Sequence, residues 1–232
     1  MNIAIIPARG GSKRIPKKNI REFCGRPMMA WPIEAAQKSE LFDRIIVSTD
    51  SEEIARVARD CGAETPFMRP KELADDYTAT RPVINHAIGE IEKIDTLPDY
   101  VCCLYPAAPF VQASDLKKAF EFLANNDCRI VFTATSFAYP IQRAFKLTGE
   151  GRPEMFYPEY LNTRSQDLDE AYHDAGQFYM GDARAFLDDI ATFSMASIPL
   201  ILPRHKVHDI DTQEDWDRAE LFFKALSPNE IG

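Results

Sequence analysis

The chain alternates short, continuously apolar runs with segments whose apolar residues recur every three or four positions. The runs at 2–6, 44–48 and 100–104 lack a polar alternation, which is typical of strands buried on both faces of a sheet. Helical spacing is found at 28–38, 51–61, 80–93 and 114–124. A succession of strand, helix and strand favours a mainly parallel sheet with helices on both faces. We therefore predict a three-layer αβα domain that spans residues 1–232.

The second half of the chain interrupts this rhythm. After a predicted strand at 130–134, residues 137–180 are rich in Pro, Gly, Tyr and Arg and show no long helical period. Inside an α/β domain such a segment is usually functional or packs on a partner subunit, so we predict an inserted arm at about 137–175. Regular elements then return as predicted strands at 177–180 and 206–210, a short helix at 182–189 and a last helix at 213–226.

The loop PARGGSKRIPKKN, residues 7–19, directly follows the first strand. It holds five cationic side chains and no acid, although the whole chain has a formal net charge of −9. It matches neither the Walker A pattern nor the dinucleotide fingerprint. Adjacent glycines, a serine hydroxyl and clustered Arg and Lys nevertheless suit a polyphosphate, and ligands of α/β sheets bind at the carboxyl ends of strands. The alternative is a solvated, mobile basic loop.

Two carboxylates near the C-terminus, Asp209 and Asp211, suit a magnesium ion. On the predicted strand their spacing puts both on one face, and Mg²⁺ is usually shared between one or two acids and substrate phosphates. The alternative is that Asp211 or Thr212 caps the last helix. Asp50 is a weaker metal candidate, because either Asp50 or Ser51 is expected to cap the helix at 51–61.

Composition excludes several classes of protein. A net charge of −9 argues against nucleic-acid binding, since only the opening loop is strongly basic. The five cysteines show no C-x-x-C spacing, which indicates a reducing compartment with neither a disulfide framework nor a zinc site. No run approaches the roughly 20 apolar residues that a membrane-spanning helix needs. We expect a cytoplasmic protein without a membrane partner.

Five motifs in order resemble the sugar-acid cytidylyltransferases, which include the CMP-sialic acid and CMP-Kdo synthetases. They are the opening loop, Ile46-Val47-Ser48-Thr49-Asp50, Arg69-Pro70-x-x-Leu73-Ala74-x-Asp76, Arg164-Ser165-Gln166-Asp167-Leu168 and Asp209-Ile210-Asp211-Thr212. The resemblance implies a Rossmann-like nucleotidyltransferase fold. It also implies a dimerisation arm, and hence a homodimer.

By the same resemblance, CTP is a substrate and Mg²⁺ is the cofactor. The implied nucleotide-binding residues are Arg9, Gly10, Gly11, Ser12, Lys18, Asn19, Arg69, Asp76, Thr78 and Thr80. Those of the opening loop would hold mainly phosphates, and the others would lie near the ribose and cytosine. The metal ligands would be Asp209 and Asp211, and the catalytic residues Arg9, Lys18 and Asp211. The implied reaction is attack of a sugar's anomeric hydroxyl on the α-phosphorus of CTP, with release of pyrophosphate. His173 and His208 are candidate bases, although a lone histidine more often has a structural role.

Two departures from the sialic acid pattern bear on the sugar. Tyr105 stands where a glutamine is typical, and residues 172–179 replace the N-G-x-x-Y motif. With residues 139–145, these segments resemble the branch of the family that activates pseudaminic acid, a nonulosonic acid that bacteria attach to flagellins. The expected sugar-binding residues are Tyr105, Gln142, Arg143, Arg164, Gln177 and Tyr179. Strand alternation predicts that Gln177 and Tyr179 share a face.

Three other functions compete with this one. The nearest is a cytidylyltransferase for N-acetylneuraminic or legionaminic acid. A nucleotide-sugar-dependent glycosyltransferase is more distant, because its D-x-D motif usually lies mid-chain. A non-enzymatic anion-binding module is opposed by the negative net charge and the acidic pair.

Overall fold

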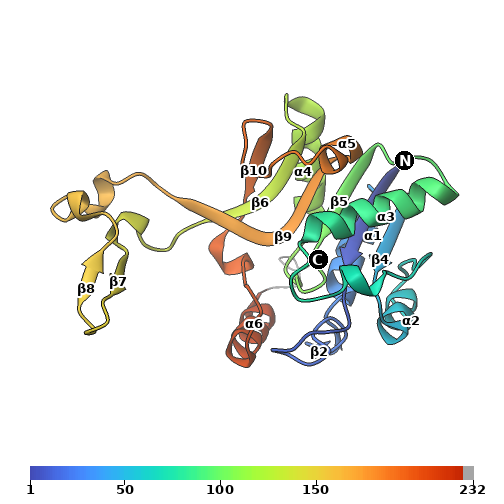
Figure 1. Cartoon of the computed structure of the whole chain (residues 1–232), viewed down its shortest axis with the longest axis horizontal. Coiled ribbons are helices and arrows are strands. Elements are labelled where there is room, and N and C mark those ends of the chain that lie inside the picture. The colour runs from blue at the N-terminus through green and yellow to red at the C-terminus, as the bar shows by residue number, and fades with distance from the viewer. Residues whose placement is uncertain (227–232) are drawn as a thin grey trace.

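A central sheet of six strands organises the computed structural model, which describes residues 1–226 (Figure 1). The strands are β1 (Asn2–Pro7), β4 (Arg44–Ser48), β5 (Tyr100–Leu104), β6 (Ile130–Ser136), β9 (Tyr172–Asp182) and β10 (Ser197–Ile201). Their order across the sheet is β10-β6-β9-β5-β1-β4. Only β9 runs antiparallel to its neighbours, so the predicted mainly parallel sheet is confirmed.

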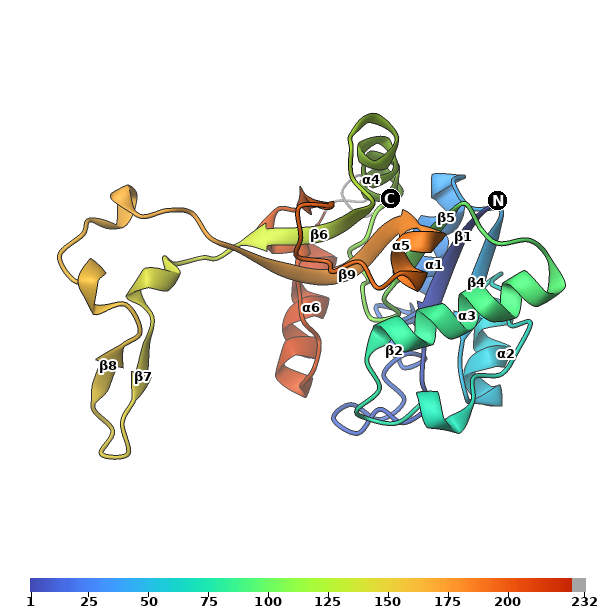
Figure 2. The same cartoon turned by 45° about the horizontal axis from the view of Figure 1, so that its top comes forward.

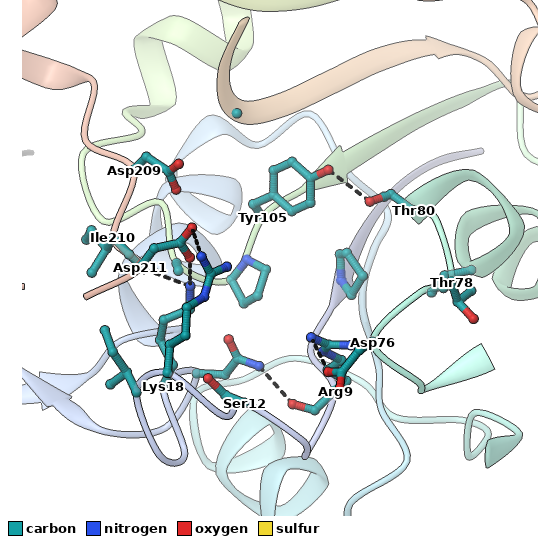
Figure 3. A pocket seen from close by; sticks show the side chains of 18 of the residues that line it. Arg9, Ser12, Lys18, Asp76, Thr78, Thr80, Tyr105, Asp209, Ile210 and Asp211 are labelled. Atoms are coloured by element: carbon teal, nitrogen blue, oxygen red, sulfur yellow. Dashed lines mark hydrogen bonds and ion pairs between the residues drawn. The ribbon is translucent and has the colours of Figure 1, made fainter. Parts of the chain in front are cut away.

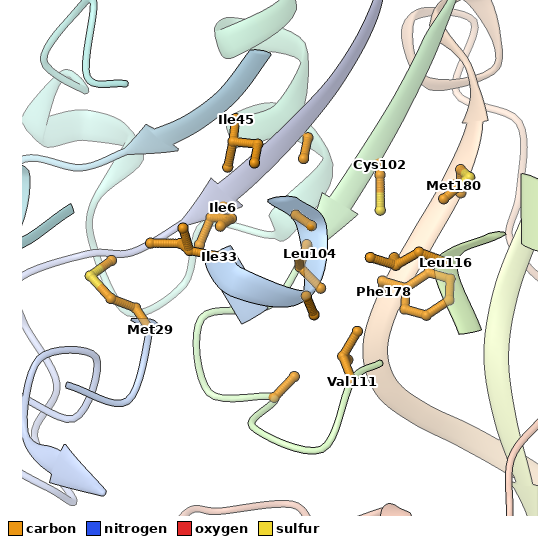
Figure 4. Close-up of a cluster of buried hydrophobic side chains, with 14 of the residues drawn as sticks. Ile6, Met29, Ile33, Ile45, Cys102, Leu104, Val111, Leu116, Phe178 and Met180 are labelled. Atoms are coloured by element: carbon orange, nitrogen blue, oxygen red, sulfur yellow. The ribbon is translucent and has the colours of Figure 1, made fainter. Parts of the chain in front are cut away.

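Helices cover both faces of this sheet. The α-helices are α1 (Ala30–Ser39), α2 (Glu52–Asp60), α3 (Thr80–Ile94), α4 (Ala113–Asn125), α5 (Ala183–Leu187) and α6 (Gln213–Ala225). One core cluster joins α1, α2 and α4 to the sheet, and Figure 4 shows Ile33, Leu116 and Phe178 within it. A second cluster packs α3 and α5 on the opposite face. The three-layer prediction is therefore confirmed.

Strand β1 contributes to both clusters. Ala4 and Ile6 belong to the first and Ile3 and Ile5 to the second, and all four are fully buried. Successive side chains of a strand point to opposite faces, so an unbroken apolar run is what a doubly covered strand requires. None of the described helices has both the length and the apolar composition to cross a membrane.

A third core cluster joins the two ends of the chain. It packs α6 against the segment after the basic loop, which carries the two-residue strands β2 (Glu22–Phe23) and β3 (Arg26–Pro27). The ring of Phe23 meets Trp216 edge-on at 5.4 Å between centroids. Thr212, one of the two expected caps, caps α6 and forms a capping box with Asp215. This packing brings the C-terminal acidic pair beside the N-terminal basic loop.

The segment between β6 and β9 projects away from the sheet (Figures 1 and 2). It carries a hairpin of β7 (Phe145–Leu147) and β8 (Pro153–Met155). Short 3₁₀ helices lie here at Ile141–Arg143, Pro158–Tyr160 and Ser165–Asp167, and elsewhere at Lys71–Leu73 and Arg204–Lys206. The exposed large apolar residues of the projecting segment, counted up to the first residue of β9, are Phe137, Tyr139, Phe145, Leu147, Phe156, Tyr157, Tyr160, Leu161 and Tyr172.

One expectation about the second half is corrected. Residues 206–210 are not a strand, because the neighbouring position at the sheet edge is taken by β10, which the sequence analysis did not identify. The backbone of the 206–210 segment is held by side chains instead. Gln177 Nε2 donates to the Lys206 carbonyl, and Lys18 Nζ donates to the Ile210 carbonyl at 2.7 Å.

A close approach at Gly181 yields a stability prediction. A Cβ atom at Gly181 would lie 2.5 Å from the Arg129 carbonyl oxygen, which is backbone and has little freedom to move. We expect Gly181→Ala to lower the free energy of unfolding by about 1–3 kcal/mol, as overpacking does. Urea denaturation followed by circular dichroism would measure the change.

Gly89 supplies the matched control. It lies inside α3, and a Cβ there would meet nothing within 4 Å. Alanine is favoured over glycine in helices, so Gly89→Ala should stabilise the protein by up to about 1 kcal/mol. A Gly181→Ala protein as stable as the parent would contradict the packing described.

Candidate active site

A cavity of about 920 Å³ opens at the carboxyl ends of β1 and β5 (Figure 3). Five stretches of chain line it: the loop after β1, residues 69–83, residues 105–107, residues 173–179 of β9 and residues 207–211. The predicted residues that it brings together are Arg9, Ser12, Lys18, Asn19, Arg69, Asp76, Thr78, Thr80, Tyr105, Tyr179, Asp209 and Asp211. Most of the candidate nucleotide residues and both acids therefore share one space.

The basic loop is fixed at its middle by an apolar residue. Ile15 is 2% exposed and packs in the cluster that contains Trp216. The Asn19 amide donates to the Arg9 carbonyl at 3.1 Å, which ties the two ends of the loop together. The loop therefore has a defined conformation, although the side chains of Lys13, Arg14 and Lys17 remain largely exposed.

On one side of the cavity, two cations of this loop contact Asp211. Arg14 Nη1 lies 2.9 Å from Asp211 Oδ2, and Lys18 Nζ lies 3.2 Å from Asp211 Oδ1. Figure 3 shows Lys18 directed at both Ile210 and Asp211. The N-terminal loop and the C-terminal acid are thus joined by charge as well as by the apolar cluster beneath them.

On the other side, two more cations contact Asp76. Arg9 Nη2 lies 3.0 Å from Asp76 Oδ1, and Lys13 also forms an ion pair with this carboxylate. The Lys13 hydrogen bond holds the pKa of Asp76 below its usual value. Asp75 shapes the same loop, because its carboxylate accepts from the amides of Tyr77 and Thr78 and from the Thr78 hydroxyl.

Asp209 differs from the other acids of the cavity. Within residues 1–226 its carboxylate takes part in no ion pair or hydrogen bond, and it faces the cavity near Asp211 (Figure 3). Partial burial and the negative charge of Asp211 raise its pKa. A carboxylate disfavoured in its charged form and lacking a cationic partner is suited to a bound cation. Asp209 and Asp211 both line the cavity, although residues 206–210 do not form the strand that their spacing predicted.

The described residues hold no cluster of three or more His, Cys, Asp or Glu side chains suited to a metal. A divalent ion at Asp209 and Asp211 would therefore take its remaining oxygens from a ligand or from water. Mg²⁺ commonly binds in this way, through one or two carboxylates plus phosphates.

The wall between β5 and β9 carries two tyrosines. The hydroxyls of Tyr105 and Thr80 lie 2.9 Å apart, and the Tyr105 and Tyr179 rings meet edge-on at 5.8 Å. The Tyr179 hydroxyl donates to the Asp174 carboxylate. Burial raises the pKa of Tyr105 to about 12 and also raises the pKa of Tyr179. Both phenols therefore remain protonated at neutral pH.

Both histidines considered as bases line the cavity. Burial lowers the pKa of His208, whose ring packs against Phe110 at 4.6 Å between centroids. His173 packs edge-on against Phe137 at 4.8 Å. These contacts give each ring a structural role, and the assignment of a base stays open.

Arg69 lines the cavity but is already bound within the protein. Its side chain donates to the Ser48 hydroxyl at 3.1 Å, to the Ser48 carbonyl, and to the Leu73 carbonyl at 3.4 Å. Burial lowers its pKa to about 10, so it remains charged at neutral pH. In this structure Arg69 therefore fastens the end of β4 to the loop that carries Asp76.

Gly10 and Gly11 do not line the cavity. The Gly10 amide donates to Asp50 Oδ1 at 2.8 Å, and a Cβ at Gly10 would lie 3.2 Å from the Ser51 Cβ. Of the two residues expected to cap this helix, Ser51 caps α2, and Asp50 binds the basic loop instead. The predicted contact of the two glycines with nucleotide stays a prediction.

The three candidate sugar residues on the arm lie outside the cavity of their own chain. Gln142 donates to the Asp169 carbonyl at 3.2 Å, and Arg143 donates to the Thr163 carbonyl. Arg164 pairs with Asp167 at 2.6 Å. All of these contacts stay within the arm.

The expectation that Gln177 and Tyr179 behave alike is wrong. Gln177 is buried and does not line the cavity, whereas Tyr179 does. The reason is a bulge in β9, where the register with β6 shifts between Phe132 and Ala134. The Thr133 hydroxyl accepts from the amides of both Gln177 and Phe178, so the alternation of side chains is lost there.

Sequence reasoning missed Asp174 and gave Lys13 and Arg14 no specific contact. Asp174 lies in the cavity and accepts from the Gly176 amide at 2.7 Å, where Gly176 has a φ of +60°. The Asp-x-Gly pattern inside an expected strand is a signal for this kind of turn and bulge. The sequence shows that Lys13 and Arg14 are charged, but it does not show which carboxylate each of them contacts.

The chain is similar to known proteins in both sequence and fold. A family model described as "Cytidylyltransferase" matches residues 3–175. A pseudaminic acid cytidylyltransferase of Campylobacter jejuni is 46% identical over 97% of both chains. A CMP-N,N'-diacetyllegionaminic acid synthase of Legionella pneumophila is 30% identical over 94% of both chains. A solved structure of CMP:2-keto-3-deoxy-manno-octonic acid synthetase complexed with CTP has a TM-score of 0.68 at 15% identity, covering 97% of this chain and 99% of that one, and supports the fold.

The contrast between the two acids predicts opposite effects on stability. The pKa of Asp209 is raised on folding, so its ionised form destabilises the folded state at neutral pH, and this penalty disappears as the pH falls through that pKa. We expect Asp209→Asn to raise the melting temperature by roughly 1 °C at pH 7. The gain should vanish as the pH approaches the ordinary aspartate value of 3.8.

Asp211→Asn is the control for this experiment. It loses the charge that contacts Arg14 and Lys18, so its melting temperature at pH 7 should fall. Differential scanning calorimetry across pH would measure both variants. A lower melting temperature for Asp209→Asn at pH 7 would show that Asp209 has a stabilising partner in the free protein.

Proposed function

The chain belongs to the cytidylyltransferase family, and on that premise we propose that it activates pseudaminic acid with CTP, giving the CMP-sugar and pyrophosphate. The observation that carries the proposal is the 46% identity, over 97% of both chains, to a pseudaminic acid cytidylyltransferase. The 30% identity to a legionaminic acid enzyme makes that sugar the less favoured substrate. Flagellin glycosylation, as a use of the product, is part of the same proposal.

The cavity supports a nucleotide site on the basic loop. Arg9, Ser12, Lys18 and Asn19 line it, and all four belong to the loop at the carboxyl end of β1. We assign the phosphates of CTP to these residues, with Gly10 and Gly11 shaping the loop. Asp76, Thr78, Thr80 and Arg69 line the same cavity, with Asp76 in contact with Arg9, and we assign them to the ribose and cytosine.

Asp209 and Asp211 are the proposed ligands of Mg²⁺. Their oxygens are hard donors, and the unpartnered Asp209 carboxylate fits a cation. When bound, Mg²⁺ would neutralise phosphate charge and lower the pKa of the attacking hydroxyl. Since Asp209 and Asp211 belong to no cluster of three or more such side chains within residues 1–226, the phosphates would complete the coordination.

The proposed reaction forms one bond and breaks one. The anomeric oxygen of the sugar acid bonds to the α-phosphorus, the bond from that phosphorus to the bridging oxygen breaks, and pyrophosphate leaves with the electron pair. The proton of the hydroxyl passes to solvent. Arg9 and Lys18 stabilise the charge that develops on the leaving group, and the cavity walls position the two substrates.

Tyr105 and Tyr179 are the proposed sugar contacts within the cavity. Their protonated hydroxyls supply hydrogen bonds, and their edge-on rings supply an apolar wall. Gln177 is buried, and we propose that it supports this wall through its bond to Lys206.

For Gln142, Arg143 and Arg164 to bind the sugar, the arm must reach the cavity of a second copy. The exposed aromatic and aliphatic residues of the arm support such a homodimer, because exposed apolar patches of this kind usually mark interfaces. A cytoplasmic location is also proposed. All five cysteines lie in the described residues and carry free thiols, which fits a reducing compartment.

Pyrophosphate release tests the reaction and the sugar together. Protein, CTP and Mg²⁺ would be mixed separately with pseudaminic, N-acetylneuraminic and legionaminic acids. We expect release with pseudaminic acid, at a kcat/KM at least tenfold higher than with the others. Release with another acid alone would refute the sugar assignment, and no release with any would refute the reaction.

Asp211→Ala is the residue-level control for that assay. We expect it to lose turnover while its circular dichroism spectrum stays that of the parent, because the change removes one of two proposed metal ligands. Wild-type turnover would remove Asp211 from the metal site.

A mixing experiment tests whether the arm acts on a partner. Arg164→Ala and Asp211→Ala should each be nearly inactive alone. In mixed dimers, one site would combine an intact cavity with an intact arm, so refolding the two together should restore about a quarter of wild-type activity. Arg152→Ala, on the same arm and 80% exposed, is the control that should remain active. A mixture as inactive as its components would mean that Arg164 acts within its own chain.

A further inference from the structure

Four cations of the basic loop face the cavity, and each is paired with a carboxylate of the protein. Arg9 and Lys13 share Asp76, while Arg14 and Lys18 share Asp211. A polyphosphate that enters the cavity must therefore compete with these carboxylates for the cations that would bind it. The contacts of Arg14 and Lys18 with Asp211 have a further consequence, because Asp211 is also a proposed metal ligand.

The two cations on Asp211 are held very differently. The Lys18 side chain is 21% exposed, and its ammonium also donates to the Ile210 carbonyl at 2.7 Å. The Arg14 side chain is 69% exposed, and the Asp211 carboxylate is its one polar contact within residues 1–226. An ion pair this exposed contributes little free energy and exchanges readily. Arg14 is therefore the cation that can leave Asp211 without disturbing the fold.

We propose that Arg14 is a positioning residue that occupies the metal side of Asp211 in the free protein and transfers to the phosphates when the nucleotide binds. This inference rests on the proposed function, since it concerns the binding of the same nucleotide and the same metal ion. With Arg14 in place, the charge of Asp211 is offset and an incoming divalent cation meets a guanidinium. When phosphates draw Arg14 away, Asp211 joins the unpaired Asp209 as a ligand.

The transfer of Arg14 from Asp211 to the phosphates couples the binding of the nucleotide to the binding of the metal. A nucleotide that removes Arg14 from Asp211 raises the affinity for the metal, and by linkage the metal raises the affinity for the nucleotide by the same factor. Arg14 thus makes binding of the metal alone weak. Binding of the nucleotide together with the metal is favoured.

Lys13 offers a matched comparison with Arg14. It is the preceding residue, it carries the same charge and it also lines the cavity, but its partner is Asp76. A general electrostatic effect of the basic loop would act through both residues. An effect that depends on contact with Asp211 would act through Arg14 alone.

The experiment is a titration of full-length protein with Mn²⁺ in the absence of nucleotide, followed by the electron paramagnetic resonance signal of free Mn²⁺. Removal of a unit charge a few ångströms from the metal predicts roughly tenfold tighter binding by Arg14→Gln than by wild type. Lys13→Gln should bind within about twofold of wild type, and Arg14→Lys should restore weak binding. Equal melting temperatures would verify that the variants are folded.

The outcomes separate this inference from the function on which it rests. Equal Mn²⁺ affinity of wild type and Arg14→Gln overturns the role of Arg14, whatever the pyrophosphate assay shows. An equal gain for Lys13→Gln also overturns it, since the effect would then be a general one. Saturable binding that Asp209→Asn does not weaken overturns the metal assignment itself, and this inference with it.

Discussion

The pairing of β1 with both β4 and β5 is the constraint on which the site depends. These three strands run parallel, so their carboxyl ends lie at the same edge of the sheet. The chain leaves β1 for β4 on one side and returns to β5 on the other, which opens a crevice at the end of β1. The basic loop begins at that point, and the Ala8 amide, which donates to the Ser48 carbonyl at 2.9 Å, holds its start against β4. Because its start is held in this way, the basic loop presents four of its cationic side chains to the cavity.

The distribution of charge follows from this position. An acidic chain gathers its cations on one loop, and the fold then places acids from distant segments on both sides of that loop. Asp76 comes from the connection between β4 and α3, and Asp211 comes from the segment before α6. The ion pairs of Lys13 and Arg14 involve exposed cations, so they orient these side chains while holding them weakly, whereas Lys18 is partly buried. The site is therefore ordered without ligand, and the exchange of these carboxylates for phosphates is part of the proposed binding of the nucleotide.

Much of the fold is predictable from the sequence, because the periodicity of apolar residues reports burial directly. The strands at 44–48 and 100–104 lie where the apolar runs put them, and Thr212 caps the last helix as its sequence indicates. Local patterns report contacts between distant segments less well. The 206–210 segment has strand-like composition, yet β10 takes the sheet edge, so its two acids reach the cavity on an irregular backbone. The sequence left the cap of α2 open between Asp50 and Ser51 for a similar reason, since the Asp50 partner Gly10 lies 40 residues away.

Strand β9 links the part of the site that sequence could predict to the part that it could not. The strand leaves the arm at Tyr172, bulges between Asp174 and Phe178, and continues between β5 and β6. The bulge turns Asp174 and Tyr179 toward the cavity and frees Gln177 to hold the backbone of the segment that precedes Asp209. One distortion therefore sets both the wall that carries Asp174 and Tyr179 and the support for the acidic pair. Because the same strand begins in the arm, a second copy that engages the arm would act on the site through a continuous, hydrogen-bonded element.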